Sequence, residues 1–280
     1  MTTTTAILFP GQGSQTTEMR DLVARVRPDL LELAAHVAGD DPFPRADEGT
    51  NFAQPAIFCA SLAGWEALGR PPAELMAGHS LGELGALVAA GALDEREGLE
   101  LVTLRGRLMH ESGLAAGDGG MLALMGAGAS EQAAEIAAAH ELTVANDNSP
   151  MQVVLSGAVA ALPAAAVQAR ELGLRPIELD VTGAFHSPMM AAAVPEFQAA
   201  LAKTTFAEPR CTVVSAVTAQ PFTDDPRVEL ADALTMPVRW REVMLTLQEL
   251  GAQRFVDVGP GRVLTGLAKR TLKGVELVNA

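Results

Sequence analysis

The chain has 280 residues, of which 49% are apolar, and this suffices for a large domain that carries a smaller one. Its formal net charge of −14 at pH 7 argues against nucleic acid and anionic membranes as partners, because both bind cationic surfaces. No apolar run reaches the ~20 residues of a membrane span, and no basic segment with an apolar core opens the chain as a secretory signal would.

The first 117 residues predict strands and helices in alternation. An apolar run over residues 5–9 predicts a strand that ends in the tight loop 10–15, and residues 73–77 predict a second short strand. Four further segments have the spacing of apolar residues that is typical of helices: 19–37, 54–68, 82–90 and 95–112.

The sequence Gly-Asp-Gly-Gly at 117–120 is the clearest break in the chain, and the pattern changes after it. Strands are predicted at 121–125, 142–145, 152–155 and 175–181, with helices at 130–140 and 159–172 and a polar turn at 146–150. The order βαββαβ is the ferredoxin-like arrangement. We therefore expect a small ferredoxin-like subdomain at residues 118–184, inserted into a large domain made of residues 1–117 and 185–280.

After the insertion the pattern of the large domain returns. The segments 186–201, 238–250 and 263–273 predict helices, and the segments 211–215 and 254–258 predict strands. Apolar strands that alternate with helices indicate a parallel sheet covered on both faces. The expected fold class is therefore α/β, with a large α/β-hydrolase-like domain around a parallel sheet and the small inserted subdomain.

The two cysteines, Cys59 and Cys211, lie far apart and lack the spacing of metal ligands. This sparse usage is typical of a protein in a reducing compartment. We expect a cytoplasmic monomer without a bound metal or cofactor.

Residues 78–82, Gly-His-Ser-Leu-Gly, fit the G-x-S-x-G nucleophile elbow. In this motif a serine stands on a sharp turn between a strand and a helix, and glycine tolerates the strained backbone. The motif predicts Ser80 as a nucleophile, and the alternative is an ordinary buried turn.

A serine nucleophile needs a base, and the chain has five histidines. His36 and His140 lie on alanine-rich helices and are expected at the surface, His110 is expected at a helix end, and His79 points away from its neighbour Ser80. His186 follows Gly-Ala-Phe where the small subdomain rejoins the large one, and such junctions favour clefts. We therefore predict His186 as the base.

The order of the serine, acidic and histidine residues along the chain distinguishes a catalytic triad from a Ser–His dyad. Ordinary α/β-hydrolases have an acidic residue and then a histidine after the serine, but no histidine follows His186 here. Asp180 is too close in sequence to His186 for triad geometry. A Ser–His dyad without a carboxylate fits better.

Eight short motifs occur between residue 9 and about residue 270: Phe9-Pro10-Gly11-Gln12-Gly13-Ser14-Gln15, Gln54-Pro55-Ala56, Gly78-His79-Ser80-Leu81-Gly82-Glu83, Leu104-Arg105-Gly106, Asn148-Ser149-Pro150 with Gln152, Gly183-Ala184-Phe185-His186-Ser187 with Met190, Pro237-Val238-Arg239-Trp240 and Val258-Gly259-Pro260-Gly261. In kind and order they resemble the malonyl-CoA:acyl-carrier-protein transacylases, a family that includes the acyltransferase domains of polyketide synthases.

The resemblance implies a ping-pong acyl transfer. Ser80 would attack the thioester of malonyl-CoA while His186 takes its proton, and the phosphopantetheine thiol of an acyl carrier protein would then accept the malonyl group. The backbone N–H groups of Gln12 and Leu81 would hold the oxyanion, which suits Leu81 because a free N–H at a helix N-terminus favours negative charge.

Arg105 would bind the free carboxylate of the malonyl group, since a guanidinium binds a carboxylate bidentately and keeps its charge when buried. The alternative is a solvated helix arginine. Gln54, Asn148 and Phe185 are expected in the pocket, although Gln54 and Asn148 fit loop-capping roles about as well. Leu81 and the Gly-Ala-Phe before His186 resemble the malonyl-preferring members.

Two features depart from the family pattern. Ala233 stands where many members have a glutamine whose backbone carbonyl orients the histidine, and a backbone carbonyl survives that change. Carrier proteins are acidic, so docking on this acidic chain needs a local basic patch. The candidates, which are equally compatible with a solvated helix face, are Arg262, Lys269, Arg270, Lys273, Arg96 and Arg107.

The sequence thus predicts malonyl transfer from coenzyme A to a carrier protein, in fatty-acid synthesis, polyketide synthesis or a malonate decarboxylase. An alternative is a serine hydrolase that releases acyl groups from carriers or from coenzyme A, since a wetter pocket favours water as the acceptor. A third reading, a non-catalytic scaffold with this fold, is disfavoured by the presence of Ser80, His186 and Arg105 together.

Overall fold

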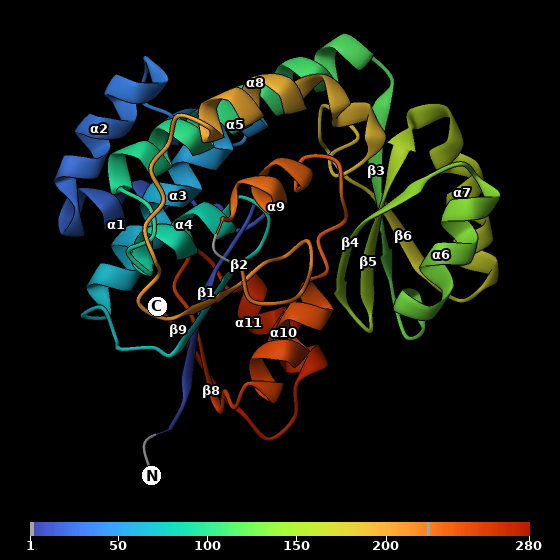
Figure 1. Cartoon of the computed structure of the whole chain (residues 1–280). Helices are drawn as coiled ribbons and strands as arrows, with labels where there is room; N and C mark the ends of the chain where they lie inside the picture. The colour runs from blue at the N-terminus through green and yellow to red at the C-terminus, as the bar shows by residue number, and fades with distance from the viewer. Residues whose placement is uncertain (1–2, 223–224) are drawn as a thin grey trace.

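A five-stranded parallel sheet forms the centre of the larger part of the molecule in the computed structural model, which describes residues 3–222 and 225–280 (Figure 1). Neighbouring strands are parallel throughout. Their spatial order is β7 (Thr212–Val214), β2 (Leu75–Gly78), β1 (Thr5–Phe9), β8 (Arg254–Asp257) and β9 (Glu276–Asn279). The expected parallel sheet is confirmed, and the edge strand β9 is one that the sequence patterns did not predict.

Helices cover both faces of this sheet, because successive side chains of each strand point to opposite sides. Ile7 and Phe9 pack on the side of α3 (Thr50–Ala67), α4 (Gly82–Ala89) and α5 (Glu95–Ala116). Ala6 and Leu8 pack on the other side, against α10 (Trp240–Glu249) and α11 (Val263–Thr271). All four strand residues are buried, so β1 lies in the middle of the core.

The helix expected at 19–37 is wrong, since two helices occupy this segment. Pro28 begins the second of them, because its fixed backbone angle and missing N–H suit a first helical position and not a helix interior. The remaining helices are α1 (Met19–Val26), α2 (Pro28–Ala38), α8 (Val194–Leu201) and α9 (Arg227–Asp232), with short 3₁₀ segments at Phe43–Arg45, Val159–Ala161 and Pro188–Ala193. Within the described ranges no helix is long and apolar enough to cross a membrane.

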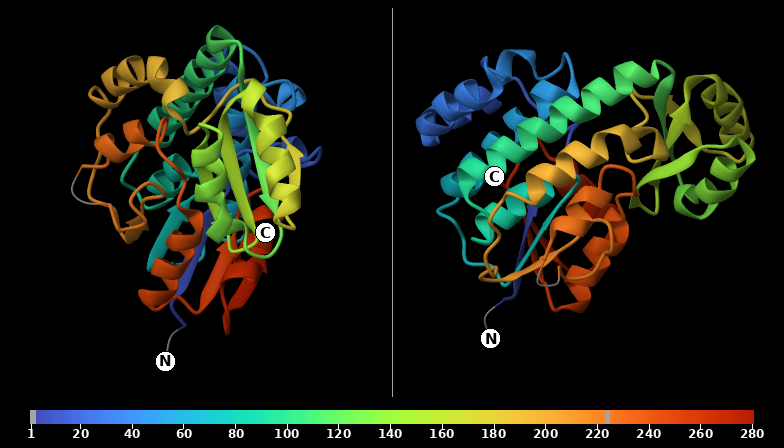
Figure 2. Two further views of the ribbon diagram at one scale, coloured as in Figure 1. Left: turned by 90° about the vertical axis from the view of Figure 1, so that its right-hand side faces the viewer. Right: turned by 45° about the horizontal axis from the view of Figure 1, so that its top comes forward.

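The smaller part of the molecule is an antiparallel sheet with two helices on its outer face (Figure 2). Its strands, in spatial order, are β4 (Thr143–Ser149), β5 (Gln152–Ala158), β3 (Gly119–Met125) and β6 (Arg175–Glu178). The helices α6 (Ala129–Ala139) and α7 (Leu162–Glu171) pack on it through a core of their own. The chain order β3-α6-β4-β5-α7-β6 is the expected βαββαβ, and the α/β class with a separate small sheet is confirmed.

The polar turn expected at 146–150 is wrong for its first four residues, because β4 continues to Ser149. Two irregularities in the pairing of β4 with β5, between Val144 and Asn146 and between Asp147 and Ser149, accommodate the polar residues within the strand. Asp147 and its neighbours bond to the large domain, which explains why a polar run is stable in a strand here.

Candidate active site

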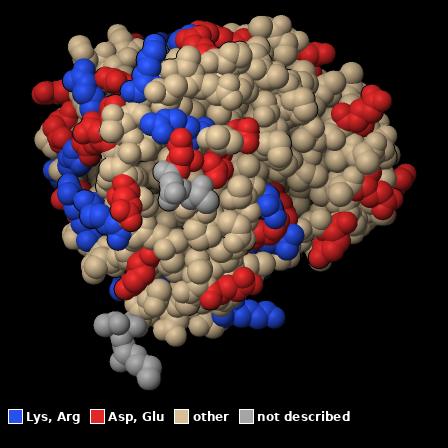
Figure 3. Space-filling view, in the orientation of Figure 1, with Lys and Arg blue, Asp and Glu red and all other residues tan. Residues whose placement is uncertain are grey.

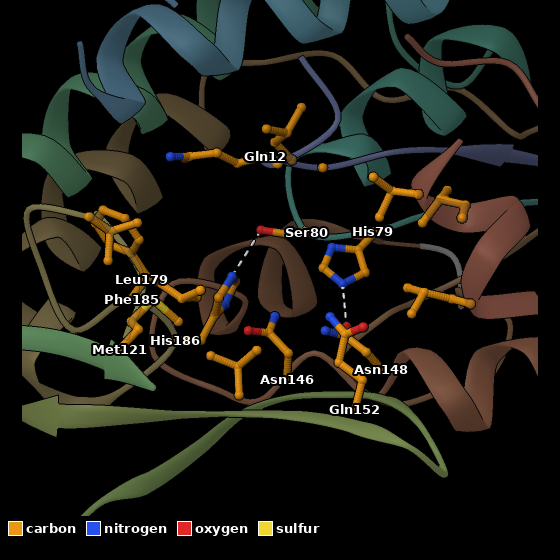
Figure 4. Close-up of a pocket in the computed structure, with 18 of the residues that line it drawn as sticks. Gln12, His79, Ser80, Met121, Asn146, Asn148, Gln152, Leu179, Phe185 and His186 are labelled. Atoms are coloured by element: carbon orange, nitrogen blue, oxygen red, sulfur yellow. Dashed lines mark hydrogen bonds between the residues drawn. The ribbon is translucent and has the colours of Figure 1, made fainter. Parts of the chain in front are cut away.

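A cavity of about 600 Å³ lies between the two parts of the molecule. The loop after β1, the elbow after β2, helix α5 and helix α11 form its large-domain wall, and strands β3, β4 and β5 form its small-domain wall. Ser80 and His186 point toward each other inside it (Figure 4). Clefts between domains are the usual place for a substrate site.

The elbow around Ser80 is built by close backbone approaches. A Cβ on Gly78 would lie 1.9 Å from the carbonyl carbon of Gly82, and a Cβ on Gly82 would lie 2.2 Å from the carbonyl oxygen of Phe9. Neither distance leaves room for a side chain. Ser80 itself has φ +54°, a left-handed conformation that costs free energy for a residue other than glycine and is concentrated at functional sites.

His186 and Ser80 lie within hydrogen-bond distance of each other. The Ser80 hydroxyl lies 2.9 Å from His186 Nε2, and His186 Nδ1 lies 2.8 Å from the carbonyl oxygen of Ala233. The Nδ1–H therefore donates to Ala233, which leaves Nε2 to accept the serine proton. His186 also has a left-handed backbone, with φ +56°. Among the described residues no carboxylate bonds to His186.

His186 is neutral over the ordinary pH range. Burial lowers its pKa to about 3, and the positive charge of Arg105 and the nearby His79 act in the same direction. The bond to the Ala233 carbonyl opposes this shift. A neutral imidazole is the protonation state that a general base requires.

Arg105 lies inside the cavity and is 3% exposed, so the reading as a solvated arginine is wrong. Its guanidinium donates to Gln54 Oε1 across 2.9 Å and to Ser80 Oγ across 3.1 Å. Gln54 is held in turn, because its amide nitrogen donates to Thr50 Oγ1 across 2.9 Å. Gln54 lies inside helix α3 and caps no loop.

The guanidinium of Arg105 is buried without a carboxylate bonded to it among the described residues. Burial lowers its pKa to about 10, and the negative charge of Glu83 opposes the shift, so Arg105 is still charged near neutral pH. Glu83 is itself 1% exposed and accepts a bond of 2.8 Å from the backbone N–H of Ala216. Burial raises the pKa of Glu83 to about 7. Sequence reasoning assigned no role to this carboxyl, although it follows the elbow directly.

Gln12 and Leu81 both line the cavity. In the part of the chain that the structure describes, neither backbone N–H donates to a protein acceptor. Leu81 precedes the first residue of α4, where the helix dipole favours negative charge. Both N–H groups are thus free to bind an oxygen in the cavity.

The small-domain wall brings further polar groups to the cavity. Asn148 accepts from His79 Nε2 across 2.8 Å, so His79, for which we predicted only a direction different from that of Ser80, is part of the cavity wall (Figure 4). Asn146 also lines the cavity, and the predicted turn hid the fact that Asn146 and Asn148 belong to one strand. Phe185 is buried in the cavity wall.

The other histidines take no part in this site. His36 is exposed, and His140 bonds to Gln168. His110 lies inside α5 and not at its end, since the helix continues to Ala116.

The candidate basic residues fall into two groups. Arg96 pairs with Glu100, and Arg107 pairs with Glu111 and Glu196. The other four lie at or near α11, are exposed, and have no acidic partner among the described residues: Arg262, Lys269, Arg270 and Lys273. Of these, Arg262 and Arg270 line the cavity.

Comparisons with known proteins identify the family of this chain. A sequence profile described as "Acyl transferase domain" matches residues 7–279. The chain is 38% identical over 291 residues to the malonyl CoA-acyl carrier protein transacylase of Synechocystis sp., covering 98% of this chain and 96% of that protein. It is also 38% identical over 284 residues to the polyketide biosynthesis protein ThaF of Burkholderia thailandensis, covering 95% of this chain and only 24% of ThaF.

Solved structures give the same result. An acyl carrier protein S-malonyltransferase from Vibrio cholerae superposes with a TM-score of 0.89 at 36% identity, covering 99% of this chain and 96% of that chain. Profile, sequence identity and fold thus coincide over nearly the whole length, and the chain belongs to the acyl transferase family.

Proposed function

We propose that this chain moves a malonyl group from malonyl-CoA to the phosphopantetheine thiol of an acyl carrier protein through an acyl-Ser80 intermediate. The observation that supports this most is the surroundings of Ser80 Oγ, which lies 2.9 Å from His186 Nε2 and 3.1 Å from the buried guanidinium of Arg105. The first contact supplies a base, and the second supplies a fixed positive charge for a negatively charged acyl group.

In the first half-reaction, the Ser80 oxygen bonds to the thioester carbonyl carbon as its proton passes to His186 Nε2. The carbonyl oxygen becomes an oxyanion, which the N–H groups of Gln12 and Leu81 stabilise. The intermediate collapses as the carbon–sulfur bond breaks, and the coenzyme A thiolate takes the proton from His186. A malonyl ester on Ser80 is left.

The second half-reaction runs the same steps with a new thiol. The phosphopantetheine thiol gives its proton to His186 Nε2 and attacks the ester carbon. The bond to Ser80 Oγ then breaks, and Ser80 takes the proton back. The 2.8 Å bond from His186 Nδ1–H to Ala233 keeps the required tautomer through both halves.

Arg105 would select the acyl group. A malonyl carboxylate in the cavity would give the guanidinium the bidentate partner that it lacks in the described part of the chain. Gln54 fixes the plane of the guanidinium through the 2.9 Å contact. An acetyl group would leave the charge of Arg105 buried and unpaired, which is costly.

The carrier protein would approach along α11. Between residues 118 and 184 the chain has eight acidic and two basic residues, and in Figure 3 the small subdomain presents acidic side chains on an otherwise uncharged surface. An acidic carrier is repelled there. Arg262 and Arg270 line the opposite wall of the cavity, and the exposed Lys269 and Lys273 lie in or just after α11. These four cations suit an acidic partner and the phosphate of its arm.

The test is intact-protein mass spectrometry after mixing with malonyl-CoA or, separately, acetyl-CoA. We expect the mass of one malonyl group to add to the wild-type chain and not to Ser80→Ala, with little acetyl addition. No adduct with either donor and no free malonate in solution would contradict the proposal. Free malonate released without a carrier would instead favour a hydrolase.

A further inference from the structure

Strand β4 joins the small subdomain to the large domain through its outer edge. One edge of β4 pairs with β5, and the other meets the large domain, where the Asp147 N–H donates to the Val238 carbonyl across 2.9 Å. The Val238 N–H donates to the Ala145 carbonyl across 2.8 Å. Figure 1 shows β4 as the strand of the small sheet beside α10 and α11. The small sheet is thus bonded through its backbone to the segment of the large domain that leads into α10.

An ion pair reinforces this junction. Arg241, in the first turn of α10, places Nη2 2.7 Å from Asp147 Oδ2 and Nε 2.9 Å from the same oxygen. The Ser130 hydroxyl donates to the same carboxylate across 3.2 Å. The side chain of Asp147 is 16% exposed and that of Arg241 is 30% exposed, so the pair is better shielded from water than an ordinary surface pair.

The segment 233–238, which we call the connecting segment, leads from this junction to the catalytic dyad. At its first residue, the Ala233 carbonyl accepts from His186 Nδ1 across 2.8 Å. At its last residue, Val238 bonds to β4. Leu234 and Val238 are buried, and the Met236 N–H donates to Asp232, so the segment has little freedom between its two anchors.

The same strand carries the polar wall of the cavity. Asn146 lines the cavity, and Asn148 holds His79, the neighbour of Ser80 in the elbow. Asp147 therefore lies between two residues that face the site. A shift of β4 away from α10 would therefore have two effects at once: it would open the cavity wall, and it would displace the connecting segment.

We propose that Arg241 and Asp147 are positioning residues for acyl transfer, because their ion pair holds β4 against the connecting segment. The ion pair thereby maintains the hydrogen bond between the Ala233 carbonyl and His186. It also keeps the cavity wall closed to bulk water. The inference rests on the proposed function for its kinetic part. Neither residue touches the reacting atoms, so each acts through the position of another group. The alternative is an ion pair that only stabilises the fold.

The kinetic test uses Asp147→Asn, Arg241→Met and the double variant in the full chain. We expect kcat for malonyl transfer to fall about tenfold while KM for malonyl-CoA changes less than about twofold, because the acyl site itself is intact. The fraction of malonyl-Ser80 lost to water should rise, since the cavity wall is loosened. The double variant should resemble either single variant, because both remove one interaction. Arg241→Lys, which retains a positive charge, should recover part of kcat.

The matched control is Arg239→Met, in the residue just after the connecting segment. Arg239 pairs with Glu242 and donates to the Thr218 carbonyl, so it loses comparable interactions without touching β4. We expect Arg239→Met to keep the wild-type kcat and the wild-type hydrolysed fraction. If it changes both as much as Arg241→Met does, the ion pair has only a structural role and the proposal is overturned.

A second readout does not depend on turnover. The Nδ1–H proton of His186, bonded to a carbonyl, should give a downfield nuclear magnetic resonance signal in the wild-type chain. Asp147→Asn should shift or broaden that signal, whereas Arg239→Met should leave it in place. An unchanged signal in Asp147→Asn overturns the inference. Failure of the wild-type chain to form a malonyl adduct would contradict the proposed function, and this measurement would still decide the role of the ion pair.

Discussion

The guanidinium of Arg105 donates a hydrogen bond to Ser80 Oγ across 3.1 Å, so the candidate acyl-binding charge touches the nucleophile itself. In a malonyl ester only one methylene separates the carbonyl carbon bonded to Oγ from the free carboxylate. A charge this close to Oγ therefore fits a short dicarboxylic acyl group. This contact gives the proposed preference for malonyl groups a geometric basis beyond charge alone.

Replacing Arg105 should reverse this preference. In Arg105→Met we expect the rate of malonyl adduct formation on Ser80 to fall about a hundredfold or more, because the carboxylate loses a buried partner. The acetyl rate should stay the same or rise. The measurement is the time course of each adduct by intact mass.

The control for this variant is Arg107→Met, on the same helix. Arg107 is exposed and bonds to Glu111 and Glu196, so its loss should leave both rates unchanged. Equal losses for malonyl and acetyl in Arg105→Met would show that Arg105 supports the fold of the site and does not read the carboxylate.

The rate of acylation should depend little on pH in mildly acidic solution. Burial and the charge of Arg105 lower the pKa of His186 to about 3, so this base is already neutral at pH 5. An ordinary histidine, with a pKa near 6.5, would lose activity tenfold for each pH unit below that value. The measurement is kcat/KM for malonyl-CoA between about pH 5 and pH 8. An acidic limb centred near pH 6.5 would contradict the buried, neutral state of His186.

Glu83 should make the chain less stable as the pH rises. Burial raises its folded pKa to about 7 from 4.5, so the folded chain binds this proton more tightly than the unfolded chain does. The stability that the proton contributes is complete below pH 4.5 and is lost as the pH rises through about 7. Glu83→Gln stays neutral and still accepts the Ala216 N–H.

We therefore compare the free energy of unfolding of Glu83→Gln with that of the wild type by urea denaturation at several pH values. The difference, variant minus wild type, should increase by up to roughly 3 kcal/mol between pH 4.5 and pH 8. Glu100→Gln, at an exposed position on α5, serves as the control and should show no such trend. Parallel pH curves for Glu83→Gln and the wild type would contradict a raised pKa at Glu83.

Reversing the charges on α11 should weaken the carrier half-reaction. For Lys269→Glu with Arg270→Glu we expect kcat/KM for the carrier protein to fall about tenfold at low salt and less at high salt, because exposed charges are screened. Arg96→Glu, whose arginine already pairs with Glu100, should change it little. The measurement is the rate of malonyl transfer against carrier concentration at two salt concentrations. An unchanged rate would place the docking surface elsewhere.

Local patterns predicted much of the fold and the centre of the site. The strand over Thr5–Phe9 and the elbow at Ser80 depend on neighbouring residues, so periodicity and a short motif suffice to find them. The contact of Arg105 with Gln54, 51 residues away, has no local signal, and only the family resemblance pointed to a buried Arg105. Asn146 was missed for a related reason, because its strand is stabilised by the distant Val238 and a polar run by itself predicts a turn.

The most direct test of acyl transfer starts from malonylated chain freed of coenzyme A. Holo carrier protein, with its phosphopantetheine thiol, is added to one sample and apo carrier protein to another, and the masses of both proteins are followed. We predict that the malonyl group leaves Ser80 and appears on the holo carrier, while the sample with apo carrier keeps its adduct. Release of free malonate at one rate in both samples would contradict the account, because water and not the carrier would then be the acceptor.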